Sequence, residues 1–132
     1  MSVTLEDIKA AGERIKGVIN ATPIISDARL SRELGANINL KAESLQKGGS
    51  FKLRGAYNKI SQLSDEEKAR GVIAASAGNH AQGVALAARY VGIGATIVLP
   101  EFAPLTKVNA TRGFGANVIL KGSAFDEAVA YS

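Results

Sequence analysis

Hydrophobic residues recur at helical spacing near the start of the chain. The apolar positions that share this spacing are Leu5, Ile8, Ala11, Ile15, Val18 and Ile19. Together they predict an amphipathic helix from about Leu5 to Val18. Thr4 followed by Asp7 resembles a capping box at the start of this helix. The helix should end before Pro23, because the residue before a proline disfavours the helical conformation.

The next stretch predicts shorter elements. A short helix is expected over Ser26 to Leu34, where Gly35 can close it. Residues Ile38 to Glu43 alternate apolar and polar side chains, which is typical of a strand with one solvated face. A glycine turn follows, and Lys52 to Leu63 then has the pattern of a helix.

The second half of the chain alternates strands and helices. An acidic helix start at Ser64 to Glu67 precedes three short apolar runs, at Val72 to Ala75, Ala95 to Leu99 and Asn117 to Leu120. Helical stretches at Asn79 to Tyr90 and about Pro104 to Phe114 separate them. This order predicts an α/β fold, a parallel sheet with flanking helices in three layers. Because the runs do not alternate, we expect strands covered on both faces. A last helix starts near Ser123 and reaches Ser132 without a cap, as if cut short.

Composition narrows the possible functions. The 132 residues carry a net charge of +4, with basic residues scattered rather than gathered in a stripe. This argues against nucleic-acid binding and suits small anionic ligands. The absence of cysteine excludes disulfides and thiolate metal sites, and a single histidine, His80, makes a metal site improbable. No apolar run is long enough to span a membrane and the N-terminus does not resemble a signal peptide, so we expect a cytoplasmic protein.

Lys52 has an unusual setting for a lysine. It lies between Phe51 and Leu53, shortly after Gly48 and Gly49. A lysine withdrawn from water loses part of its preference for the charged form, and the neutral amine is the nucleophile that forms a Schiff base with an aldehyde. The alternative is a surface lysine whose stem lies on an apolar face and whose ammonium group stays in water.

The segment from Ala74 to Gly83 leads from a predicted strand into a predicted helix. Loops at the carboxyl ends of strands bind ligands in open α/β sheets, and a helix N-terminus attracts anions. Small residues from Ala75 to Gly78 would let a carboxylate or phosphate approach the backbone. The alternative is that Ser76 or Asn79 merely caps the helix and that His80 is a surface or packing residue.

The two motifs together resemble a known family. Ser-Phe-Lys-x-Arg-Gly at 50–55, followed by Ser-Ala-Gly-Asn-His at 76–80, is similar to fold type II pyridoxal-phosphate enzymes, and most closely to the threonine ammonia-lyase and serine racemase group. The resemblance implies pyridoxal 5'-phosphate as cofactor and Lys52 as the Schiff-base lysine, which would also act as base on the substrate. It implies that Phe51 packs near the cofactor and that Asn79 bonds its phenolic oxygen. The substrate carboxylate would be held by Ser76, Ala77, Gly78, Asn79 and His80.

The resemblance also implies a reaction. L-Threonine or L-serine would be dehydrated and deaminated to a 2-oxo acid and ammonia. Ala77 stands where serine racemase has a serine that resembles an acid/base group, and its methyl group cannot transfer a proton. This favours elimination over racemisation. A cysteine-synthase type of β-replacement enzyme and a non-catalytic module that binds an amino acid remain alternatives.

Family members are more than twice as long as this chain, and their glycine-rich phosphate loop lies beyond its end. We therefore expect an N-terminal fragment with little activity alone. Residues 1–64 would belong to the large, lysine-bearing domain and residues 65–132 to most of a small α/β domain. We expect a homo-oligomer in the full-length parent, with an amino acid as its ligand and neither nucleic acid nor membrane as partner.

Overall fold

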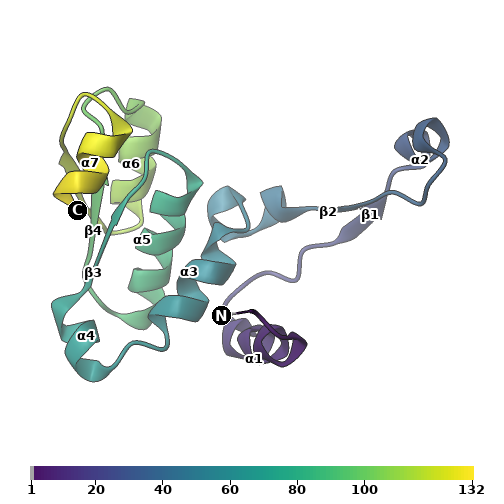
Figure 1. Cartoon of the computed structure of the whole chain (residues 1–132), viewed down its shortest axis with the longest axis horizontal. Helices are drawn as coiled ribbons and strands as arrows, with labels where there is room; N and C mark the ends of the chain where they lie inside the picture. The colour runs from purple at the N-terminus through teal and green to yellow at the C-terminus, as the bar shows by residue number, and fades with distance from the viewer. Residues whose placement is uncertain (1) are drawn as a thin grey trace.

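A capped helix begins the chain in the computed structural model, which describes residues 2–132 (Figure 1). Helix α1 (Leu5–Ile15) has the predicted capping box, since the Asp7 N–H donates to Thr4 Oγ1 at 3.2 Å and the Thr4 N–H donates to Asp7 Oδ2 at 2.9 Å. The helix ends before the predicted Val18. The cause is Gly17, which adopts a left-handed φ of 81°.

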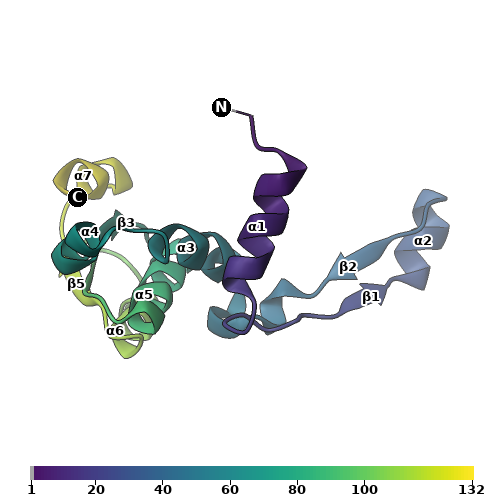
Figure 2. The same ribbon diagram turned by 90° about the horizontal axis from the view of Figure 1, so that it is seen from below.

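A two-stranded arm projects from the rest of the molecule in both ribbon views (Figures 1 and 2). Strand β1 (Ile24–Ser26) pairs antiparallel with β2 (Asn39–Lys41). At the tip lies α2 (Ala28–Leu34), capped by Asp27 and closed by left-handed Gly35 as predicted. Every residue of β1 and β2 is exposed, so the expectation of one solvated face on the Ile38 to Glu43 strand is wrong. Strand β1 was not predicted.

The segment between the arm and the sheet is helical. Two short 3-10 turns, η1 (Glu43–Leu45) and η2 (Lys47–Gly49), lead into α3 (Lys52–Ile60). Gly48 and Gly49 take positive φ values of 78° and 71°, which side chains disfavour, so the glycine turn is confirmed. Helix α4 (Asp65–Arg70) follows with a second capping box.

A parallel three-stranded sheet forms the second half of the chain. Its strands β3 (Val72–Ala75), β4 (Ala95–Leu99) and β5 (Asn117–Leu120) match the predicted apolar runs residue for residue and are ordered β3-β4-β5. Helices α5 (Asn79–Val91) and α6 (Leu105–Gly113) pack on one face, and α7 (Phe125–Tyr131) packs on the other (Figure 2). The predicted three-layer α/β fold is confirmed.

Helix α5 lies at the centre of the core. Its residues from Ala81 to Ala88 are all buried, because α3 packs on one side of it and the sheet on the other. Strand β4 is covered on both faces as expected. The outer strands are not, since Ile73 of β3 is 51% exposed and Leu120 of β5 is 40% exposed. Within residues 2–132, no helix has the length and apolar character needed to cross a membrane.

Candidate functional site

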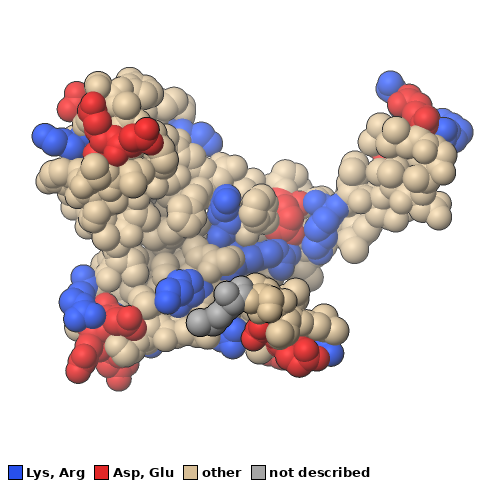
Figure 3. Space-filling view, viewed as in Figure 1, with Lys and Arg blue, Asp and Glu red and all other residues tan. Residues whose placement is uncertain are grey.

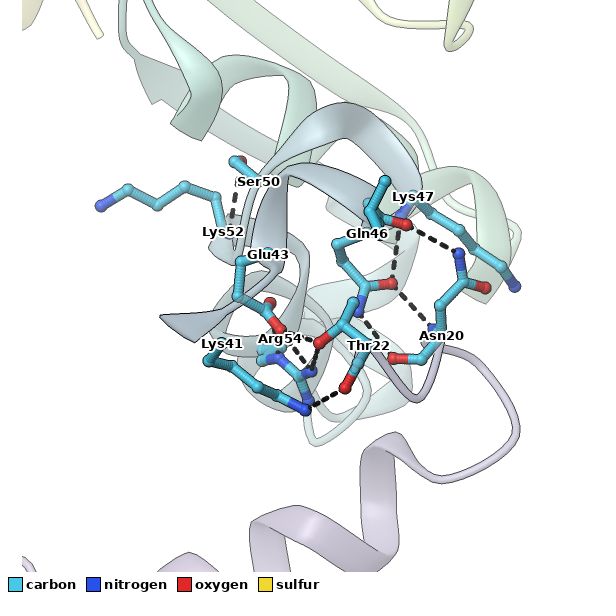
Figure 4. Close-up of polar contacts among 10 residues, drawn as sticks. Asn20, Thr22, Lys41, Glu43, Gln46, Lys47, Ser50, Lys52 and Arg54 are labelled. Atoms are coloured by element: carbon cyan, nitrogen blue, oxygen red, sulfur yellow. Dashed lines mark hydrogen bonds and ion pairs between the residues drawn. The ribbon is translucent and has the colours of Figure 1, made fainter. Parts of the chain in front are cut away.

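Lys52 is the first residue of α3 and is half-buried. Its amine lies 4.9 Å from the centroid of the Phe51 ring, and that ring is 57% exposed. Figure 4 shows the Lys52 side chain extended away from the polar cluster around Glu43 and Arg54. Among the described residues, no carboxylate lies within ion-pair distance of its amine. The amine is therefore free to react with a ligand.

Gly83 of α5 lies directly against Lys52. A Cβ placed on Gly83 would lie only 3.0 Å from the carbonyl carbon of Lys52, so α5 and the start of α3 touch through their backbones. Asn79 precedes Gly83 by one helical turn, roughly 6 Å along the axis, on the same face of α5. Lys52 therefore lies at this helix contact, and Asn79, 27 positions later in the sequence, lies one turn before the contact on α5.

The loop before α5 is shaped by its own backbone contacts. The Ser76 N–H continues the sheet ladder to the Val98 carbonyl at 3.2 Å, and the Ser76 hydroxyl accepts from the Gly78 N–H at 3.3 Å. Gly78 is the N-cap residue of α5, and no side chain caps the helix. The alternative in which Ser76 or Asn79 caps α5 is therefore wrong. The first N–H groups of the helix remain available to a ligand.

Space is open beside this loop. A Cβ built on Gly78 meets no atom within 4 Å. A negatively charged group could therefore approach the backbone there without steric hindrance. In Figure 3, Lys and Arg side chains lie across the middle of the molecule, over α3 and the base of the arm, with acidic side chains beside them at the base of the arm.

His80 faces a different space. Its side chain is exposed and lines a cavity of about 320 Å³ between α3, α5 and β3. The other residues lining this cavity are mostly apolar, including Ile60, Leu63 and Val84, and neither Lys52 nor Asn79 lines it. The structure therefore brings His80 to this cavity and brings neither Lys52 nor Asn79 to it. The described residues contain no group of three or more acidic or histidine side chains that could hold a metal ion.

A polar cluster that the sequence did not predict holds the start of α3 in place (Figure 4). Arg54 binds Glu43 with two hydrogen bonds, of 2.8 Å from Nε and 2.7 Å from Nη2. Thr22 also donates to the Glu43 carboxylate. The hydrogen bonds from Arg54 are the main reason that the pKa of Glu43 falls to about 2. This pair fixes the base of the arm to the helix that carries Lys52.

Gln46 forms a second link in the same region. Its side-chain oxygen accepts from the Asn20 N–H at 2.8 Å, and its amide nitrogen donates to the Asn20 carbonyl at 2.9 Å. Lys47 donates to the carbonyl of Val18 at 2.6 Å. The segment after α1 is thereby tied to the turn that precedes Lys52.

Comparison with known proteins identifies the chain. A family model described as pyridoxal-phosphate dependent enzyme matches residues 15–132. The chain belongs to this family of pyridoxal-phosphate dependent enzymes. The resemblance indicated by the two motifs, and with it the assignment of pyridoxal phosphate as cofactor, is confirmed.

Individual relatives show which enzymes of the family the chain is similar to. The chain is 60% identical over 126 residues to an L-threonine ammonia-lyase of Thermotoga maritima, covering 96% of this chain and 31% of the relative. It is 57% identical to a catabolic L-threonine dehydratase of Staphylococcus aureus, covering 98% of this chain and 38% of that protein. The structure of maize serine racemase superposes with a TM-score of 0.93 at 36% identity, covering 100% of this chain and 40% of that one. The chain thus spans 31% to 38% of the length of these two enzymes related in sequence.

The residues of this structure fit one side of a pyridoxal-phosphate site. Lys52 carries a free amine and Phe51 an exposed aromatic ring at the start of α3, and Asn79 carries a carboxamide one turn before Gly83 on α5. Open space beside Gly78 leaves room for a planar ligand with an anionic substituent. The family's cofactor is therefore compatible with these side chains.

Proposed function

We propose that the protein to which this chain belongs is a pyridoxal-phosphate-dependent ammonia-lyase that acts on L-threonine or L-serine. The observation that carries the proposal is the contact of Gly83 with the Lys52 backbone, which packs the start of α3 against the helix that follows the loop from Ser76 to Gly78. Two relatives at 60% and 57% identity are named for threonine deamination or dehydration, whereas identity to the serine racemase is only 36%. This difference favours threonine.

The roles of the residues follow from their chemistry. The Lys52 amine would hold the cofactor covalently at its aldehyde carbon, the Phe51 ring would cover one side of it, and the Asn79 amide would donate to its ring oxygen. The substrate carboxylate would be bound by the Ser76 hydroxyl and by the backbone N–H groups of Ala77, Gly78, Asn79 and His80 at the positive end of α5. The Ser76 N–H is not available to it, because it donates to the Val98 carbonyl. His80 would contribute its backbone only, since it lines an apolar cavity that neither Lys52 nor Asn79 lines.

A proton would be removed from one face of the substrate Cα and not returned on the opposite face. When bound, pyridoxal phosphate supplies an electron sink for the negative charge left at the substrate Cα. The Lys52 amine would accept the proton from Cα, as a general base held in place by α3. Ala77 carries only a methyl group on the loop, so this chain offers no proton donor there for the opposite face of the substrate. The Cβ–O bond would then break and the β-hydroxyl would leave as water, and hydrolysis of the resulting unsaturated amine would give a 2-oxo acid and ammonia rather than the mirror-image amino acid.

Chemical trapping tests the central assignment. Borohydride reduction of the whole protein in the presence of pyridoxal phosphate should attach the cofactor irreversibly to the peptide that contains Lys52, as shown by mass spectrometry. Lys52→Ala should abolish both this adduct and the visible absorbance of the protein-bound cofactor. Lys59→Ala, which removes an exposed lysine of the same helix, should leave both unchanged. Persistence of the adduct in Lys52→Ala would contradict the proposal. Faster turnover of O-acetylserine with sulfide than of threonine would instead favour a β-replacement enzyme.

The proposal also covers the division into domains, the cellular location and the oligomeric state. Residues 1–64 would form part of the large domain and residues 65–132 most of the small one. The whole protein would be a cytoplasmic homo-oligomer with an amino acid as its substrate. Comparing its mass in solution with the mass of a single subunit would test the oligomeric state.

A further inference from the structure

Lys107 and Asn79 are joined across two helices. Lys107 lies in the first turn of α6, and its Nζ donates to Oδ1 of Asn79, the first residue of α5, at 3.4 Å. The two helices lie side by side in both ribbon views (Figures 1 and 2). The function proposed above gives Asn79 a role but gives none to Lys107. The proposed function therefore leaves the contact between Lys107 and Asn79 unexplained.

The chemistry of the two groups makes the contact directional. A carboxamide has an acceptor end and a donor end, and the two ends exchange places when the group turns over. An ammonium group has three donors and no acceptor. It can therefore bind only the oxygen end of the Asn79 amide. The NH₂ end must then point away from α6.

The backbone at Lys107 is well held. The Thr111 hydroxyl, which is fully buried, donates to the Lys107 carbonyl at 2.8 Å. The neighbouring Val108 is buried in the core and anchors the same turn. Among residues 2–132, no carboxylate lies within ion-pair distance of the Lys107 amine. No acidic side chain in this part of the protein thus competes with Asn79 for it.

We propose that Lys107 is a positioning residue that fixes the orientation of the Asn79 amide, with its oxygen toward α6 and its NH₂ group toward the ligand site. The inference rests on the proposed function, in which Asn79 donates a hydrogen bond to the cofactor's ring oxygen. Without Lys107 the amide turns freely and presents its oxygen to the ring oxygen part of the time. Two acceptors then face each other and repel.

The first experiment needs no cofactor. In the chain labelled with ¹³C, the side-chain carbonyl resonance of Asn79 is identified by its loss in Asn79→Ser. We expect Lys107→Met to move this resonance upfield, because the oxygen loses a charged donor, and Lys107→Arg to keep it in place. Arg112→Met removes an exposed positive charge from the same helix and should leave the resonance unchanged. An unchanged resonance in Lys107→Met overturns the proposal whatever the protein's function is.

The second experiment measures discrimination between ligands. The whole protein should bind pyridoxal phosphate at least about tenfold more tightly than the analogue that lacks the ring hydroxyl, as expected for one lost hydrogen bond to a charged group. In Lys107→Glu the new carboxylate accepts from the NH₂ end of Asn79, so the ratio should fall toward one, while Lys107→Arg keeps it. If Lys107→Glu still binds pyridoxal phosphate much more tightly than the analogue, the positioning role of Lys107 is overturned and the proposed function is not. A ratio near one in the unmodified protein overturns the role of Asn79 in the proposed function, and with it the positioning role.

Discussion

Gly83 lies directly against the backbone of Lys52. A Cβ built on Gly83 would stand 3.0 Å from the carbonyl carbon of Lys52, 3.0 Å from its Cβ and 3.2 Å from the nitrogen of Leu53. A glycine inside a helix costs about 1 kcal/mol relative to alanine. The glycine is explained by this close approach, which sets the distance between the lysine and the loop before α5.

Replacement of this glycine should destabilise the fold. In Gly83→Ala the new methyl group meets backbone atoms that cannot move aside without shifting α3. Overpacking of this kind costs typically about 1–3 kcal/mol, which outweighs the helix propensity gained. We expect urea denaturation to show a loss of about 1 kcal/mol or more in the free energy of unfolding.

Gly12→Ala is the matched control for this variant. Gly12 is also inside a helix, α1, but a Cβ there meets no atom within 4 Å. It should therefore stabilise the protein by about 0.5–1 kcal/mol, the opposite sign. Equal effects of the two substitutions would show that the contact with Lys52 carries no energetic weight.

The pair of Glu43 and Arg54 should make the stability depend on pH. Folding lowers the pKa of Glu43 from 4.5 to about 2, so the folded state binds this proton less readily than the unfolded chain. The stabilisation is complete above about pH 4.5 and is lost as the pH falls toward 2. A shift of this size corresponds to at most about 3 kcal/mol. Since the side chains of Arg54 and Glu43 remain 29% and 17% exposed, solvent screening reduces it to on the order of 2 kcal/mol.

Chemical denaturation at pH 7 and pH 3 measures this effect. In Glu43→Gln the difference in unfolding free energy between the two pH values should be smaller than in the unmodified chain. Asp7 and Glu67, whose pKa values are also lowered, remain in both proteins and cancel in the comparison. Glu33→Gln removes an exposed partner of Arg29 and should change the pH dependence little. An identical response in Glu43→Gln and the unmodified chain would refute the shift.

Local sequence patterns predicted the helices and strands better than they predicted the side-chain contacts between them. Strands β3, β4 and β5 were found from their apolar runs because each run is bounded by turn residues. Strand β1 was missed, since its three residues gain their structure only by pairing with β2, 13 positions or more away. The bonds from Arg54 to Glu43 and from Lys107 to Asn79 join residues 11 and 28 positions apart, a separation that periodicity does not report. One signal was available for Gly83, because a glycine inside an otherwise strong helix pattern indicates close packing.

The arm should make the isolated chain associate. Ile25 and Leu40 face each other across the β1 and β2 pair and are 52% and 46% exposed. Exposed apolar side chains on unpaired strand edges favour contact with other chains. The double variant Ile25→Thr, Leu40→Thr keeps β-forming residues while it removes apolar surface, and should lower light scattering at high protein concentration. Val3→Thr changes an exposed residue outside the arm and should not. Scattering that falls equally in both variants would exclude the arm as the cause.

Gly78→Ala should separate ligand binding from folding. The φ of Gly78 is −134°, which any residue can adopt, and a Cβ there meets no protein atom within 4 Å. The unfolding free energy should therefore change by less than about 0.5 kcal/mol. The same methyl group would project into the space where the substrate carboxylate is proposed to bind. In the whole protein we expect the KM for threonine to rise by about tenfold or more, a loss of about 1.4 kcal/mol in binding. Gly113→Ala also adds a methyl group in open space, at the end of α6, and should leave the KM for threonine unchanged. If Gly78→Ala binds threonine as well as the unmodified protein does, the loop before α5 is not the carboxylate site.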